Sequence, residues 1–270
     1  MNKLKTKDFD LKHTLECGQL FRREKKDGFY YLIGRNNIIK LKQEGNYLFF
    51  EGASEEFIKN YFAFDEDYAK ITSELKKDRF VASAIKKYPG LRICRQDPWE
   101  CLISFILSSA SNIPKIKRNI EELSKCFGRK IKLGNYESYS FPEKGEIKEL
   151  CTIKKCGCGF RSSYIFETAK IADEKWLNSL RKLSYAKAKK DLMKLKGVGE
   201  KVADCVLLFS LGFGEAFPVD VWIKRVMEEL YFGNRKTSEK KIREFAQKKW
   251  GKYAGYAQEF LYHYRRNKND

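Results

Sequence analysis

The feature that most constrains this chain is a glycine-rich turn between two short helical segments, LKGVG at residues 195–199. Gly197 and Gly199 can both adopt positive φ, and they let bare backbone come close to a ligand. We expect the second helix to begin at about Glu200, where its unpaired backbone N–H groups form a site for an anion. Further along, the chain passes through a Gly/Pro-containing loop and enters another helix with Asp220 in the N-cap position.

The charge of the chain points to a polyanionic partner. It has 55 Lys+Arg against 36 Asp+Glu, a formal net charge of +19 and a pI near 9.4. Nucleic acid is the first candidate for such a partner, and a generally basic protein without one is the alternative. No apolar run approaches the ~18 residues that a membrane span needs, and the first residues lack the apolar core of a signal peptide. We therefore expect a soluble, intracellular protein with no membrane partner.

Disulfide and metal chemistry find little support in the sequence. The eight cysteines do not form a disulfide pattern for a chain of 270 residues, so we expect reduced thiols. Cys156 and Cys158 lack the two-residue spacer of a metal knuckle, and no four-cysteine cluster follows the glycine-rich turn. With only two histidines, a histidine-rich metal site is not expected. The sequence predicts neither an iron–sulfur cluster nor a required cofactor.

The spacing of apolar residues divides the chain into a sheet-forming part and a helical part. Residues 1–52 alternate short apolar runs with glycine-containing turns, which is typical of an antiparallel sheet. Residues 54–87 change to helical spacing, and after Pro89-Gly90 the chain is predicted to be nearly all helical. We therefore predict an α+β fold, an N-terminal antiparallel β-sheet domain with helices followed by a mainly α-helical region. The predicted segments are the sheet domain at 1–92, the helical region at 93–270, the helix-hairpin-helix at about 188–210 and the Gly/Pro loop at about 211–222.

Separated motifs, in order along the chain, carry a family resemblance. They are CGQLFR at 17–22, RQDPWECLISFILSS at 95–109, GCGFR at 157–161, VGEKVADC at 198–205 and YAGYAQEFLY at 253–262. From about residue 9 to residue 262 the chain resembles the 8-oxoguanine DNA glycosylase/AP lyase family, in the helix-hairpin-helix Gly/Pro-Asp superfamily of base-excision glycosylases. The resemblance implies a bifunctional enzyme of base-excision repair. It would flip 8-oxoguanine out of duplex DNA and excise it through a lysine Schiff base, followed by β-elimination.

The resemblance assigns the chemistry to Lys201 and Asp220. Lys201 lies two residues after the second hairpin glycine, where the bifunctional branch carries its nucleophile. An amine attacks in its neutral form, which is roughly 0.04% of a free lysine at pH 7. Asp220 would stabilise positive charge at C1′ as the glycosidic bond breaks. The alternatives that stay open are one more phosphate-binding lysine for Lys201 and a simple helix cap for Asp220.

The resemblance also implies a pocket for the flipped base. The Gly18 carbonyl would accept a hydrogen bond from N7–H of 8-oxoguanine, a proton that guanine lacks. Cys205 and Tyr262 would stack on opposite faces of the base, and Gln258 would read its Watson–Crick edge. The alternative for Gly18 is a glycine that only permits a turn.

Contacts to DNA follow from the same resemblance. Phe160 would be an aromatic wedge in the base stack, Arg161 a donor to the unpaired base, and Trp222 a phosphate contact. For Phe160 a core side chain, and for Arg161 a phosphate contact, are the alternatives. The predicted DNA-contacting residues are Asn112, Lys115, Phe160, Arg161, Gly197, Gly199 and Trp222. The hairpin carbonyls of Met193, Leu195 and Val198 would hold a possible structural cation.

The sequence departs from the family pattern where three successive asparagines, and an arginine after them, usually stand. This chain has Ala110, Ser111 and Asn112, and Lys115 replaces the arginine. Lysine lacks the bidentate fork with which arginine recognises a base edge. We therefore hypothesise a relaxed preference for the base opposite the lesion.

The implied partner is double-stranded DNA containing 8-oxoguanine, bound by a monomer. We expect a cytoplasmic, nucleoid-associated protein in a bacterium, or a nuclear one in a eukaryote. Two other functions stay open. A monofunctional glycosylase for alkylated bases would need Asp220 but no nucleophilic lysine. A non-catalytic helix-hairpin-helix protein would bind DNA without cleaving it.

Overall fold

The N-terminal part of the chain forms an antiparallel sheet in the computed structural model, which describes residues 1–34 and 36–267. The strands are β1 (Asn2–Lys5), β2 (Arg23–Lys26), β3 (Phe29–Ile33), β4 (Ile38–Glu44), β5 (Tyr47–Glu51), β6 (Lys130–Leu133) and β7 (Tyr136–Tyr139). In the described residues, the main sheet has the order β1-β5-β4-β3-β2, and β6 pairs with β7 alone. Buried residues pair across it, with Leu32 opposite Ile39 and Leu41 opposite Phe50. The antiparallel sheet predicted for residues 1–52 is therefore confirmed.

Helices make up most of the remaining described chain. They are α1 (Leu11–Glu16), α2 (Glu55–Tyr61), α3 (Tyr68–Leu75), α4 (Arg79–Lys87), α5 (Pro98–Leu107), α6 (Ile113–Phe127), α7 (Leu150–Lys155), α8 (Arg161–Ile171), α9 (Glu174–Ser179), α10 (Tyr185–Leu192), α11 (Glu200–Val206), α12 (Val221–Tyr231), α13 (Glu239–Trp250) and α14 (Ala254–Arg266). Shorter helical turns are η1 (Lys144–Glu146), η2 (Leu180–Lys182), η3 (Leu207–Leu211) and η4 (Gly251–Tyr253).

The predicted helices between residues 54 and 87 begin at residues whose side chains cap the first turn. Ser54, Asp67 and Asp78 each accept a hydrogen bond from the backbone N–H three residues further on. Such caps satisfy N–H groups that have no partner within the helix. Helical spacing and capping residues thus agree, and α2, α3 and α4 confirm the prediction for this segment.

A β-hairpin interrupts the part of the chain that the sequence predicted as nearly all helical. β6 and β7 pair with Ile131 opposite Ser138. The ring of Tyr136 stacks on that of Tyr31 in β3, with 4.1 Å between ring centroids. The Arg22 guanidinium donates to the Tyr139 carbonyl. The prediction was wrong here because these stabilising contacts come from the distant sheet, whereas the hairpin's own strands are short.

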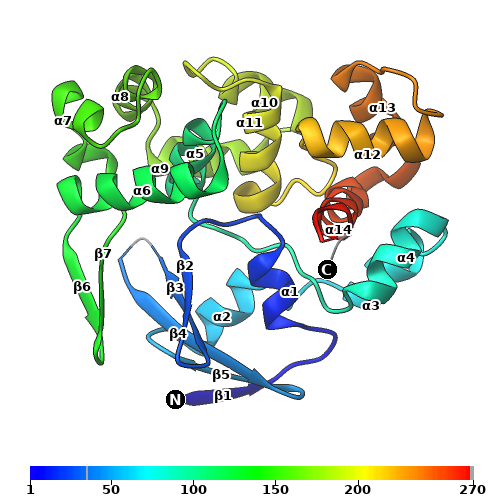
Figure 1. Ribbon diagram of the computed structural model, residues 1–270, viewed down its shortest axis with the longest axis horizontal. Coiled ribbons are helices and arrows are strands. Elements are labelled where there is room, and N and C mark those ends of the chain that lie inside the picture. Colours follow the sequence, from blue (N-terminus) through cyan, green and yellow to red (C-terminus); the bar gives the residue numbers. More distant parts are fainter. Residues whose placement is uncertain (35, 268–270) are drawn as a thin grey trace.

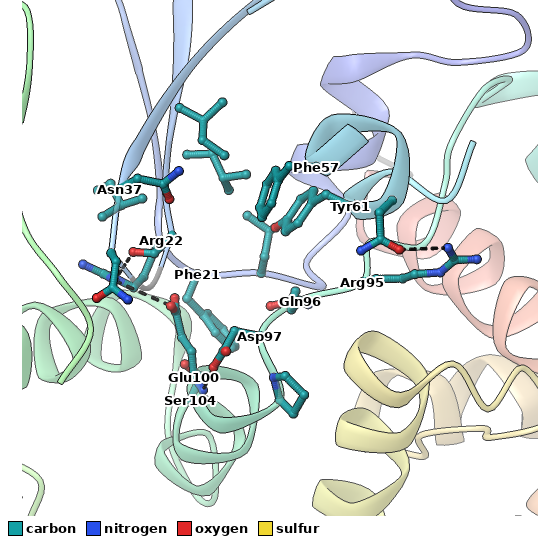
Figure 2. Close-up of a pocket in the computed structure, with 18 of the residues that line it drawn as sticks. Phe21, Arg22, Asn37, Phe57, Tyr61, Arg95, Gln96, Asp97, Glu100 and Ser104 are labelled. Carbon is teal, nitrogen blue, oxygen red and sulfur yellow. Dashed lines mark hydrogen bonds and ion pairs between the residues drawn. The ribbon is translucent and has the colours of Figure 1, made fainter. Parts of the chain in front are cut away.

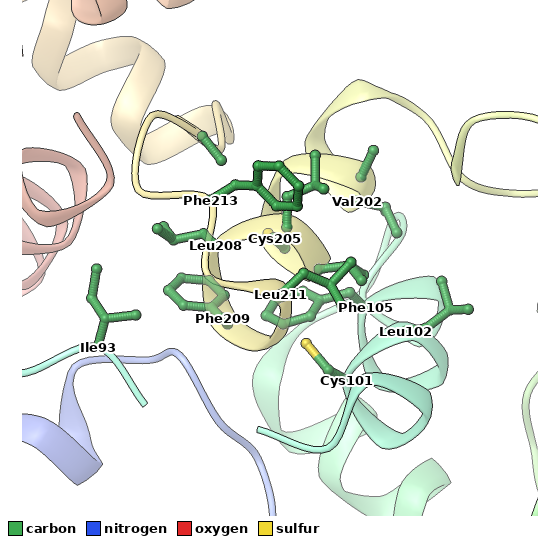
Figure 3. Packing of buried hydrophobic residues seen from close by; sticks show 14 of the residues in the cluster. Ile93, Cys101, Leu102, Phe105, Val202, Cys205, Leu208, Phe209, Leu211 and Phe213 are labelled. Atoms are coloured by element: carbon green, nitrogen blue, oxygen red, sulfur yellow. The ribbon is translucent and has the colours of Figure 1, made fainter. Parts of the chain in front are cut away.

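Separate hydrophobic clusters lie under the sheet and within the helical part of the described chain. The cluster under the sheet joins its strands to α1 and α2. The larger cluster includes α3 and α4, and α4 lies beside the C-terminal helix α14 (Figure 1). Side chains of α5 pack there against those of α11 and η3 (Figure 3). No helix in the described ranges is long and apolar enough to cross a membrane. The domain boundary near residue 92 stays a prediction.

Candidate functional site

The hairpin between α10 and α11 depends on its two glycines in different ways. Gly197 has φ +82°, and a β-carbon there would collide with the ring of Tyr164. Gly199 has φ −86° and is the N-cap of α11, so of the two glycines only Gly197 uses the positive φ that both permit. A β-carbon at Gly199 would meet nothing within 4 Å. Gly197 is therefore required by the turn itself, and Gly199 leaves the start of α11 open. The helix begins at Glu200, as predicted.

A buried acid ties the two hairpin helices together. Asp204 on α11 is fully buried and accepts hydrogen bonds from the Tyr185 hydroxyl at 2.6 Å and the Lys189 ammonium at 3.0 Å, both on α10. Burial raises the pKa of Asp204 to about 6, and the Lys189 charge opposes that shift. Asp204 was not among the predicted site residues. Its signal is an acid on the buried face of an apolar helix, which needs a partner of opposite charge.

Lys201 is in the first turn of α11, and its side chain reaches the C-terminal end of α5. Its Nζ donates to Ser108 Oγ at 3.1 Å and lies 5.0 Å from the centroid of the Phe105 ring. The Ser108 hydroxyl donates to the Phe105 carbonyl at 2.7 Å, so its oxygen lone pairs face the lysine. The ammonium group is thus directed by Phe105 of α5 and by Ser108, the residue that follows the helix. Ser108 was not predicted as a site residue, because its contact spans 93 positions in the sequence.

Asp220 and Cys205 lie in the electrostatic field of the same site. Asp220 is the N-cap of α12, as predicted, and its Oδ1 accepts from the Ile223 N–H at 2.8 Å. Cys205 is buried, and burial raises the pKa of its thiol to about 12. The Lys201 charge lowers that pKa, whereas the Asp220 charge raises it. The predicted stacking thiol therefore lies within electrostatic reach of both the predicted nucleophile and the predicted stabilising carboxylate.

Gly18 and Tyr262 meet across the two halves of the chain. Gly18 has φ +111°, and a β-carbon there would lie 2.9 Å from Cε1 of Tyr262. Larger side chains are excluded at this position by backbone conformation and by space. Gln258 is 5% exposed, and its Oε1 has no hydrogen-bond partner among the described residues. An unpaired buried amide oxygen is costly, and a bound ligand that donates to it would remove the cost.

Two further buried polar residues, Gln19 and Glu259, lie next to the segment that carries Gly18. The side chain of Gln19 donates to the Arg92 carbonyl at 2.8 Å and accepts from the Cys94 N–H at 2.7 Å, which fixes the strand-like segment before α5. Glu259 is 2% exposed beside Cys17. Burial, and then the negative charge of Asp220, raise the pKa of Glu259 to about 7. Neither residue was predicted, although a glutamine next to the motif glycine and an acid in an apolar helix were visible signals.

The turn between α5 and α6 holds the predicted residues Asn112 and Lys115. Asn112 is the N-cap of α6, and its Oδ1 accepts from the Lys115 N–H at 3.0 Å. Both side chains are exposed. Ala110 has φ +46°, an unusual conformation for a residue with a β-carbon. The turn therefore presents an amide and an ammonium group at the surface.

Arg161 is buried against the turn that follows α5. Its side chain is 2% exposed and donates to the carbonyls of Ser109 at 2.6 Å and Ala110 at 2.7 Å. In this structure the guanidinium is held by the protein's own backbone, and the contact of Arg161 with the unpaired base stays a prediction. Phe160, the neighbouring residue, is 54% exposed, which argues against a core role and agrees with a wedge.

Other predicted contacts lie at the surface of the hairpin and of α12. Trp222 is 51% exposed in the first turn of α12, beside the exposed Val221. Met193 is exposed at the start of the hairpin turn, and the Leu195 carbonyl accepts from the Val198 N–H at 3.1 Å. In the described chain, no group of three or more His, Cys, Asp or Glu side chains is arranged to hold a metal ion. All eight cysteines are free thiols.

A cavity of about 720 Å³ lies between the sheet and the N-terminal end of α5. Arg22, Tyr61 and Glu100 are among its lining residues, and Arg22 forms an ion pair with Glu100 at 3.7 Å (Figure 2). The lining extends along this helix to Ser104, but it includes none of Phe105, Ser108 and Lys201. The cavity is therefore separate from the cluster around Lys201.

Comparison with known proteins places both halves of the chain in one group. Residues 2–102 match the family model described as 8-oxoguanine DNA glycosylase, N-terminal domain. Residues 103–252 match the model described as HhH-GPD superfamily base excision DNA repair protein.

Individual relatives agree with these matches. A probable N-glycosylase/DNA lyase of Methanothermobacter thermautotrophicus is 32% identical over 213 residues, 70% of this chain and 68% of that protein. The N-glycosylase/DNA lyase of Saccharomyces cerevisiae is 36% identical over 211 residues, which are 64% of this chain and 56% of the yeast protein. The structure of MBOgg1 with a low-affinity DNA ligand superposes with a TM-score of 0.94 at 38% identity, covering 99% of this chain and 96% of that one. The Clostridium acetobutylicum 8-oxoguanine glycosylase/lyase, bound to double-stranded DNA with cytosine opposite 8-oxoG, gives 0.91 at 32% identity, covering 100% and 99%.

Proposed function

The chain belongs to the 8-oxoguanine DNA glycosylase family, and on that premise we propose that it excises 8-oxoguanine from duplex DNA and then cleaves the strand as an AP lyase. The observation that carries this proposal is the position of Lys201. Its Nζ is directed by Ser108 at 3.1 Å, and its charge acts on the buried thiol of Cys205, as does that of Asp220. A monofunctional glycosylase needs no lysine in this position.

The chemistry follows from the groups gathered there. The neutral Lys201 amine attacks C1′ of the damaged nucleotide, and the bond from C1′ to the base breaks, with the electron pair leaving on the base. Asp220 stabilises the positive charge that develops at C1′. The Lys201 nitrogen gives up a proton, which neutralises the departing base, and the C1′–O4′ bond then breaks with its electron pair on O4′, which takes up a proton. The protonated imine left at C1′ makes the C2′ proton acidic, and loss of that proton expels the 3′ phosphate by β-elimination. Asp220 also caps α12, which fixes its carboxylate before the reaction.

Recognition of the base is assigned to the residues around Gly18. Its carbonyl accepts from N7–H of 8-oxoguanine and repels the N7 lone pair of guanine. The unpaired Oε1 of Gln258 accepts from the Watson–Crick edge of the base, which supplies the partner that the buried amide lacks. Cys205 and Tyr262 stack on the two faces of the base.

The DNA is held by backbone and side chains at the surface. The N–H groups after Gly199 bind phosphates of one strand, and Trp222 donates to another phosphate. Phe160 enters the base stack, and Lys115 lies near the opposite strand. The carbonyls of Met193, Leu195 and Val198 would hold a structural cation at the hairpin, since carbonyl oxygens are ligands for hard cations. The protein acts as a monomer on the DNA of the cytoplasm.

A direct test uses an 8-oxoG:C duplex beside an otherwise identical G:C duplex. We expect release of free 8-oxoguanine, detected by chromatography, together with strand cleavage at the lesion on a denaturing gel. The G:C duplex should stay intact. Release without cleavage would contradict the lyase, and binding with neither would contradict both activities.

A further inference from the structure

Arg161 holds the turn that follows α5 through hydrogen bonds to its backbone, and we call this set of bonds the clamp. Its guanidinium donates through Nε to the Ser109 carbonyl at 2.6 Å, and through Nη2 to the Ala110 carbonyl at 2.7 Å. A third bond, from Nη1, reaches the Cys158 carbonyl at 3.4 Å. These donors bind backbone in two segments that lie about 50 positions apart in the sequence. A planar fork of this kind fixes direction as well as distance.

The clamped turn carries the residue that directs the nucleophile. Ser108 immediately precedes the two clamped carbonyls, and its Oγ accepts from Lys201 Nζ at 3.1 Å. Ala110, with φ +46°, is in a region that residues with a β-carbon rarely adopt. A backbone in this conformation persists only where its surroundings hold it, and Arg161 is the side chain that does so.

The residue next to Arg161 in the sequence lies at the surface of the molecule. Phe160 directly precedes Arg161, is 54% exposed, and its ring centroid lies 4.4 Å from the guanidinium carbon. Gly157 and Gly159 have φ +73° and +60°, so the segment leading to Phe160 is built from tight turns. The exposed Phe160 ring therefore lies against the same guanidinium that holds the turn beside Lys201.

On the basis of the function proposed above, we propose that Arg161 is a positioning residue for Lys201. It holds the Ser108–Ala110 turn where the Ser108 hydroxyl orients the lysine amine, and it couples the exposed Phe160 to the nucleophile. Arg161 thus acts on the rate of the chemical step from within the protein. A role in reading the base opposite the lesion would require the same guanidinium to leave its carbonyl partners.

The first test compares Arg161→Lys with Arg92→Lys. Arg92 is a matched control because it is 4% exposed and also donates to a backbone carbonyl, that of Ala63, at 2.7 Å. With enzyme in excess over an 8-oxoG:C duplex, Arg161→Lys should slow single-turnover excision by about 10- to 100-fold, with DNA affinity within about twofold of wild type. Arg92→Lys should leave the single-turnover rate unchanged. Weaker binding with an unchanged rate in Arg161→Lys would overturn the proposal.

A second test does not depend on the folding of the arginine variant. Ser108→Ala leaves the clamp in place and removes only the acceptor of Lys201. It should slow excision and lower the yield of borohydride-trapped complex, with DNA affinity unchanged. A wild-type rate in Ser108→Ala would refute the path through Ser108.

The double variant shows whether the two residues act on one path. If Arg161 acts through Ser108, the rate loss in the double variant should be close to that of the slower single variant. Multiplied losses would mean independent effects and would overturn the coupling. Failure of the proposed function gives a different result, since wild-type protein would then release no base at any enzyme concentration.

Discussion

Replacing the two hairpin glycines one at a time should separate folding from DNA binding. Gly197→Ala places a β-carbon at φ +82° and against the Tyr164 ring. The left-handed backbone costs about 1–2 kcal/mol, and displacing a packed ring costs about 1–3 kcal/mol. The variant should therefore lose about 2–5 kcal/mol of unfolding free energy, which for a chain of this size lowers Tm by roughly 4–20 °C. Urea unfolding followed by circular dichroism measures the loss.

Gly199→Ala is the matched control for stability. Its φ of −86° suits alanine, and the new methyl group meets nothing within 4 Å. A poorer N-cap and a less flexible unfolded chain offset one another, so the unfolding free energy should stay within about 1 kcal/mol of wild type. The methyl group stands over the N–H groups at the start of α11, so DNA affinity should fall about tenfold. Equal destabilisation by both substitutions would refute this reasoning.

Three other predictions address catalysis, specificity and pH. Asp220→Asn should keep the α12 cap, because asparagine caps as well as aspartate, but slow excision about 10²–10³-fold; a small loss of rate would leave Asp220 as a cap alone. Wild-type excision from 8-oxoG:C and 8-oxoG:A duplexes should differ by less than about tenfold, and Lys115→Arg should increase the preference for cytosine; a wild-type preference of orders of magnitude would contradict this. Burial, and then the His13 charge, lower the pKa of the buried His263 to about 4. Because the unfolded chain then binds the proton more tightly, stability is fully present above about pH 6.5 and should fall by about 2 kcal/mol as pH drops towards 4, after allowance for solvent screening. His263→Phe should remove this loss of unfolding free energy, measured by urea titrations at pH 7 and 4.5. An unchanged loss in the variant would mean that His263 is not its source.

Local signals in the sequence predicted those parts of the site that depend on local geometry. The cap at Asp220, the start of α11 at Glu200 and the turn at Gly197 all follow from backbone rules within a few residues. Gly199 shows how far such rules reach. A glycine permits positive φ but does not require it. Only the fold shows that Gly199 instead leaves open space above the start of α11.

Contacts between distant segments explain what the sequence did not predict. Arg161 follows a glycine-rich turn and looked like a surface donor, yet its partners are carbonyls of the turn after α5. Ser108 directs Lys201 across 93 positions. The β6–β7 hairpin has a short alternating pattern around Gly134, and its stacking partner, Tyr31, lies in the first sheet. Spacing along one segment contains no information about such partners.

Borohydride trapping on an 8-oxoG:C duplex, with wild type beside Lys201→Gln, tests the central claim most directly. Borohydride reduces an imine between lysine and C1′ to a stable amine, which appears as a protein–DNA adduct on a denaturing gel. We predict an adduct with wild type and none with Lys201→Gln. Base release by wild type without any adduct would mean that water, and not Lys201, is the nucleophile, and an equal adduct with Lys201→Gln would place the nucleophile on another residue.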